Sequence, residues 1–104
     1  MKNSNAEKLF DKLEKSYEEI IAQMEDSFTF HQFIKKLSQA RQDIYVQILN
    51  EYTENKYPFK SVHSIIAKRL GKFDHLVKYD KWISKSENIF GKENGAVVWH
   101  KVKK

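Results

Sequence analysis

The sequence NIFGKENGAVVWHKV, residues 88–102, has the clearest β signal in the chain and sets the expected fold. Its first three and last seven residues are β-prone runs, and the five residues between them begin and end with glycine. This pattern predicts a β-hairpin whose turn is at 91–95. Alternation along the second run places Val97 and Trp99 on the side that covers a helical core.

Upstream of the hairpin, the sequence predicts one short helix and one ambiguous element. Pro58 ends the preceding helical pattern, and a helix over 61–70 stops at Gly71. A second helix over 74–84 fits the capping pattern, but Asp80 would then lie on or near its inward stripe. An extended pair that turns at Asp80 is therefore the alternative for this segment.

The first half of the chain has the periodicity of amphipathic helices. Apolar residues recur at three- and four-residue spacing through 6–28, and Asp26 with Ser27 marks the end of that helix. Its apolar stripe either packs on its own domain or forms a homodimer interface. Thr29 is the expected N-cap of the next helical segment, which continues to about residue 52 with a junction in 38–42.

Charge divides the chain into two unlike parts. Through Asn55 there are seven Lys/Arg against ten Asp/Glu, a net charge of −3, whereas the remainder has twelve against four, a net charge of +8. Such asymmetry indicates a polyanionic partner for the second part, with nucleic acid as the first candidate. Eleven of those twelve basic residues are lysines, which favours attraction to phosphate over reading of bases.

Composition argues against several other classes of protein. The chain has no cysteine and no apolar run that approaches the length of a membrane span, so we expect a cytoplasmic protein that does not insert into a membrane. Its four histidines are scattered, and no phosphate loop or nucleophile motif is present. We therefore expect no metal, no cofactor and no enzymatic activity.

The order helix, extended residue, helix, tight turn, helix and basic hairpin resembles the winged helix-turn-helix family over about 41–102. Within it, Ala67 is followed four residues later by Gly71 and then, after six more, by Val77, a spacing similar to that of the family. The resemblance implies a mainly α fold with a small β-hairpin, preceded by one or two amphipathic helices. The corresponding division is an N-terminal helix, 1–28, and a winged-helix-like domain, 29–104.

In that family the second helix of the pair enters the major groove and the wing contacts phosphate or the minor groove. Carried over to this chain, the resemblance implies four groups of contacts. They are His75, Lys78, Tyr79, Lys81 and Lys85 on the helix 74–84; Lys68, Arg69 and Lys72 beside the preceding helix; Lys92 and Asn94 at the wing tip; and, if 61–70 is the groove helix instead, Ser64 with Lys68.

The predicted function is therefore nucleic-acid binding, most directly to duplex DNA, by a transcriptional regulator or accessory factor whose contacts are mainly with phosphate. The helix 74–84 contains no Arg, Asn or Gln, the side chains best suited to bidentate base reading, so strong sequence specificity is not expected. The alternative is a protein-interaction module on the same scaffold that binds no nucleic acid.

Overall fold

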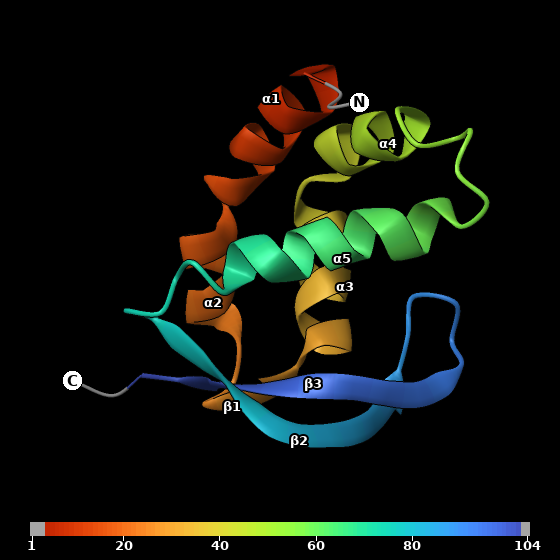
Figure 1. Ribbon diagram of the computed structural model, residues 1–104. Helices are drawn as coiled ribbons and strands as arrows, with labels where there is room; N and C mark the ends of the chain where they lie inside the picture. The colour runs from red at the N-terminus through yellow and green to blue at the C-terminus, as the bar shows by residue number, and fades with distance from the viewer. Residues whose placement is uncertain (1–3, 103–104) are drawn as a thin grey trace.

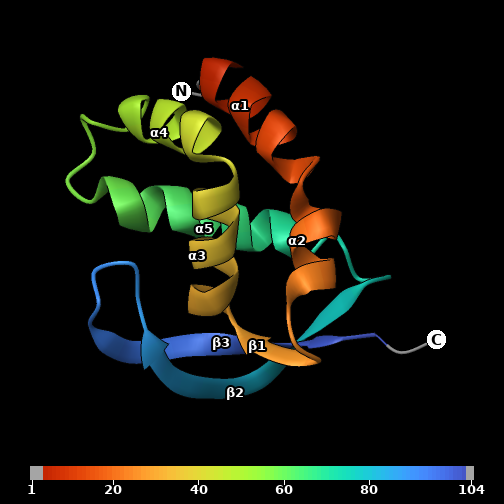
Figure 2. The same ribbon diagram turned by 180° about the vertical axis from the view of Figure 1, so that it is seen from behind.

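A computed structural model describes residues 4–102, apart from the side chains of Ser4 and Lys81. Over these residues the chain forms five helices and three strands: α1 (Ser4–Glu14), α2 (Tyr17–Gln23), β1 (Ser27–Thr29), α3 (Phe30–Ala40), α4 (Gln42–Asn50), α5 (Pro58–Leu70), β2 (Val77–Glu87) and β3 (Glu93–Lys101). The strands form one antiparallel sheet in the order β1-β3-β2, and the helices lie on one side of it (Figure 1, Figure 2).

This sheet makes the prediction of a mainly α fold with a small β-hairpin wrong. Strands β2 and β3 are eleven and nine residues long, and β1 comes from the N-terminal half of the chain. Phe28 of β1 lies opposite Trp99 of β3, so the sheet joins the two halves of the sequence. The architecture is α+β, with a three-stranded sheet as one of its two layers.

The predicted helix over 74–84 is wrong, because most of that segment is strand β2. Its residues pair with β3, Val77 opposite Lys101 and Tyr79 opposite Trp99. Asp80 lies where the register shifts between Tyr79 and Ile83, and its carboxylate contacts Nε2 of His100 at 2.8 Å. Cross-strand pairing outweighs the local capping signal that favoured a helix.

The alternative of an extended segment was correct in type but not in the position of its turn. Asp80 sits in an irregularity of β2, and the chain reverses at 88–92 instead. There the side-chain oxygen of Asn88 accepts hydrogen bonds from the backbone N–H groups of Phe90, at 2.9 Å, and Lys92, at 3.1 Å. Gly91 has φ of 78°, a left-handed conformation that favours glycine. A hairpin is therefore present, but its turn is three residues earlier than expected and its first strand is β2, so the predicted strand at 88–90 is wrong.

The N-terminal segment 6–28 is not one helix. It is interrupted between α1 and α2 and ends in strand β1. At the interruption the N–H of Ser16 bonds the carbonyl of Leu13 at 3.0 Å, which tightens the turn and redirects the chain. The apolar stripe proposed as a homodimer interface is buried in the core of the same chain, with Phe10, Leu13 and Ile20 at most 2% exposed. That stripe is not available to a second copy.

Several helix limits agree with the prediction. The side chains of Thr29 and Gln32 form a reciprocal capping box at the start of α3, and a break at Arg41 separates α3 from α4. Helix α5 ends before Gly71, as expected. Its start differs, because Pro58 is the first helical residue, a position where the missing N–H of proline is tolerated.

Tyr17 is the polar side chain most deeply placed in the core. It is 0% exposed, and its ring centroid lies 5.3 Å from the rings of both Phe33 and Phe73. Its hydroxyl donates a 2.9 Å hydrogen bond to the backbone carbonyl of Ile66. A single residue of α2 is thereby tied to α3, to α5 and to the turn before β2.

Replacing Tyr17 by phenylalanine keeps the ring and removes this buried hydrogen bond. We expect Tyr17→Phe to lower the free energy of unfolding by about 1–2 kcal/mol, measured by urea denaturation. Tyr79→Phe is the matched control, because the Tyr79 side chain is 69% exposed and should lose no measurable stability. Equal stabilities of the two variants would contradict the role assigned to Tyr17.

Candidate nucleic-acid interface

Helix α5 has one buried and one exposed stripe. Val62, Ile66 and Leu70 are each 0% exposed and face the core. Lys60, Ser64 and Lys68, spaced four residues apart, are exposed on the helix. Because residues at this spacing share a helix face, the exposed stripe presents two ammonium groups with a hydroxyl between them.

Lys72 is exposed in the turn just beyond α5, where it lines a cleft together with carboxylates of α1 and α2. Of the predicted contacts, Ser64 and Lys68 are therefore brought together on one helix face. Lys60 was missed, because the segment after Pro58 was interpreted as non-helical until Ser61. Its spacing of four residues from Ser64 was the signal that could have identified it.

The predicted contacts of 74–84 lie on a turn and a strand instead of a helix. His75 is exposed in the turn and stacks on Phe73, with ring centroids 6.0 Å apart. Lys78 is exposed on β2, opposite His100, and Tyr79 packs edge-on to Trp99 at 5.6 Å. The side chain of Lys81 lies outside the described part of the structure. These residues do not form one helical reading face.

The remaining predicted contacts belong to the far half of the hairpin. Lys85 on β2, Lys92 in the turn and Asn94 on β3 are all exposed. The turn lies beside the N-terminal end of α5, where the rings of Phe59 and Phe90 meet edge-to-face at 5.0 Å (Figure 1). The hairpin end and the Lys60 end of α5 are thus neighbours in space.

Arg69, the basic part's only arginine, is held within the chain. Its Nη1 lies 2.8 Å from Oδ1 of Asp11 and 2.7 Å from Oε2 of Glu14, and the guanidinium sits 5.3 Å from the ring centroid of Phe10. Burial alone would lower the pKa of Arg69, but the hydrogen bonds and charges of the two carboxylates outweigh it and raise the pKa. This residue ties α5 to α1, so we remove it from the candidate interface.

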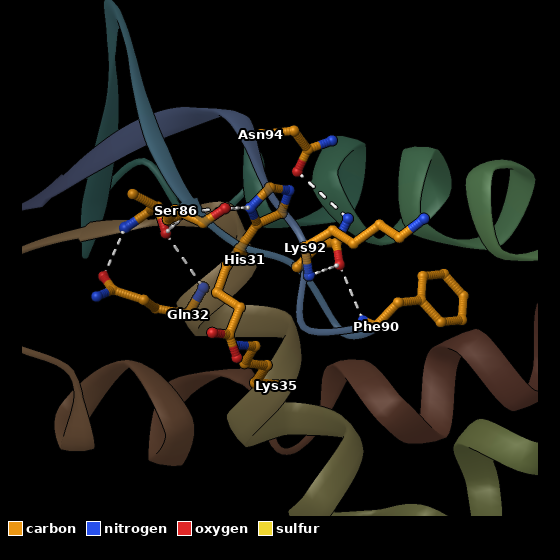
Figure 3. Close-up of polar contacts among 10 residues, drawn as sticks. His31, Gln32, Lys35, Ser86, Phe90, Lys92 and Asn94 are labelled. Carbon is orange, nitrogen blue, oxygen red and sulfur yellow. Dashed lines mark hydrogen bonds and ion pairs between the residues drawn. The ribbon is translucent and has the colours of Figure 1, made fainter.

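A polar cluster fixes the hairpin to the start of α3 (Figure 3). Nδ1 of His31 lies 2.9 Å from Oγ of Ser86, and that hydroxyl donates to Oγ1 of Thr29 at 2.9 Å. One turn further along α3, Nζ of Lys35 lies 3.3 Å from Oε1 of Glu87. Strand β2 is therefore held by side chains as well as by its pairing with β3, which positions the hairpin against the helical layer.

Ser27, His100 and Asp80 form a hydrogen-bonded chain across the three strands. Oγ of Ser27 lies 2.7 Å from Nδ1 of His100, and Nε2 of His100 lies 2.8 Å from Oδ2 of Asp80. The same residue types make the triads of serine hydrolases, where a substrate pocket adjoins the serine. None of these three residues lines the main cavity of the described structure, so we assign them a structural role as a cross-strand clamp.

His63 of α5 is the histidine with the most perturbed environment. Its Nε2 lies 2.6 Å from the hydroxyl of Tyr45. Burial, aided by the charge of His31, lowers the pKa of His63 from 6.5 to about 4, and burial raises the pKa of Tyr45 to about 12. At neutral pH this hydrogen bond therefore joins the Tyr45 hydroxyl to an uncharged imidazole.

Comparisons with known protein families, with curated proteins and with solved structures found no significant match to this chain. Within residues 4–102 no helix has the length and apolar character needed to cross a membrane. Over the same residues no group of three or more metal-binding side chains comes together.

The lowered pKa of His63 predicts a pH dependence of stability. The unfolded chain takes up this proton near pH 6.5 but the folded chain only near pH 4, so stability falls as the pH drops between these values. Between pH 7 and pH 4 the free energy of unfolding of the natural chain should fall by roughly 2–3 kcal/mol more than that of His63→Gln. Urea denaturation at both pH values measures this difference, and parallel losses in the two proteins would contradict the assignment.

Proposed function

We propose that this chain binds nucleic acid, most readily duplex DNA, with α5 in or along the major groove and the β2–β3 hairpin on the flanking backbone. The observation that carries the proposal is the exposed stripe of Lys60, Ser64 and Lys68 on α5. Ammonium groups on a helix face release counterions from phosphate, and a serine hydroxyl can donate to phosphate or to a base edge.

The groove element in this proposal is α5, which corresponds to the alternative groove helix 61–70 considered from the sequence. The resemblance to winged helix-turn-helix proteins remains a hypothesis, which rests on α5 and on the β2–β3 hairpin that follows it. Lys85, Lys92 and Asn94 are exposed on the hairpin and act as its backbone contacts. A transcriptional regulator or an accessory factor would both use such a surface.

The chemistry of the interface favours weak sequence discrimination. The exposed stripe of α5 has no Arg, Asn or Gln, and Arg69 is engaged by two carboxylates. Bidentate base recognition needs such side chains, whereas lysine acts on phosphate as a point charge. The affinity should therefore depend strongly on salt and little on sequence.

We test this by fluorescence anisotropy with a labelled DNA duplex at several salt concentrations. The double variant Lys60→Gln/Lys68→Gln should weaken binding at every sequence and reduce the slope of log Kd against log salt by about 2. Lys36→Gln is the matched control, since Lys36 is exposed on α3 and lies outside α5 and the hairpin. A duplex of scrambled sequence should bind within about threefold, because lysine contacts phosphate.

Absence of binding at low ionic strength would overturn the proposal. So would an equal loss in Lys36→Gln and in the double variant, because binding would then follow net charge and not this surface. Tighter binding to the single strand than to the duplex would contradict the choice of duplex DNA.

A second candidate function, binding to another protein, is favoured by one specific feature. Tyr79, Trp82 and Ile83 of β2 are 69%, 73% and 70% exposed, and they lie around the register shift of that strand. Clustered exposed apolar side chains are characteristic of protein interaction surfaces. Failure of the DNA test would leave this surface as the better candidate.

A further inference from the structure

A cavity of about 510 Å³ lies between α5, the start of α3 and the hairpin. Small-molecule sites in proteins usually span about 300–1,000 Å³ and are largely apolar, with a few polar groups that orient the ligand. The cavity meets both conditions. Two of the elements that form it, α5 and the hairpin, also form the candidate nucleic-acid interface.

Aromatic side chains form part of the apolar wall of the cavity. It includes Phe30, Phe59, Phe90 and Trp99. Phe59 and Phe90 are set edge-to-face at 5.0 Å, and Phe90 is 63% exposed, so part of this wall is open to an incoming ring. Trp99 is only 5% exposed, yet its indole N–H has no hydrogen-bond partner among the described residues. Aromatic walls of this kind favour a flat, unsaturated ligand.

The one side chain with a full charge on the described lining of the cavity is positive. Lys60 is the lysine on the lining, and no carboxylate of the described structure lines it. His63 also lines the cavity, and because the Tyr45 hydroxyl occupies Nε2, Nδ1 is the ring nitrogen that can carry a proton toward a ligand. An ammonium group and a neutral N–H donor together suit one anionic group.

We propose that this cavity binds a small planar aromatic monoanion, such as an aromatic carboxylate, with its rings against the phenylalanine wall and its acid group at Lys60. His63 donates a second hydrogen bond to the acid. The site goes beyond the proposed nucleic-acid binding and does not depend on it.

The test uses 2-naphthoate and its neutral amide, 2-naphthamide, as matched probes in isothermal titration calorimetry with the full chain and no DNA. Naphthoate should bind at least about tenfold more tightly than the amide, because only the anion gains the charge-assisted contact. Lys60→Gln should remove that advantage and leave binding of the amide unchanged. Lys36→Gln should leave both affinities unchanged.

A second variant tests the cavity itself. Ala67 lines the cavity on α5, and Ala67→Phe should fill part of it and weaken both probes, with circular dichroism checking that the chain still folds. No binding of naphthoate at millimolar concentration overturns the proposal. Equal affinities for naphthoate and amide also overturn it, because they show an apolar surface without anion selectivity. Since DNA is absent, these outcomes are independent of those of the anisotropy test.

Discussion

Pairing of β3 on both of its edges is the constraint on which the rest of the structure depends. One edge holds β1, which precedes three of the helices, and the other holds β2, which follows all of them. Trp99 lies opposite Phe28 on one side and Tyr79 on the other, so one residue of β3 aligns both neighbours. Because the chain between β1 and β2 contains α3, α4 and α5, closing this sheet fixes where α5 lies relative to the hairpin.

Positioning of α5 then determines which side chains remain for a ligand. Tyr17 bonds the buried side of α5, and Arg69 ties its last turn to α1. Lys60, Ser64 and Lys68 therefore remain exposed to solvent. The polar cluster at His31 holds the hairpin close enough to form the walls of the cavity. The basic stripe and the cavity beside Lys60 therefore arise from one helix–hairpin arrangement.

Features that depend on neighbouring residues could be predicted from the sequence, and features that depend on distant pairing could not. The N-cap at Thr29 and the helix stop at Gly71 are local, and both were predicted. Strand β1 pairs with residues some seventy positions away, and its three residues have no strand signal of their own. Arg69 was assigned to nucleic acid because its partners, 55 and 58 residues earlier, leave no mark on the local pattern.

Chemical-shift mapping can show whether α5 and the hairpin form one nucleic-acid surface. Amide spectra of the ¹⁵N-labelled chain would be recorded during titration with a short DNA duplex. We expect the amide signals of Lys60, Ser64 and Lys68 and of the hairpin turn 88–92 to shift progressively. The signals of α1 and α4 should not change. Shifts confined to α1 and α4, or none at all at saturating duplex, would contradict it.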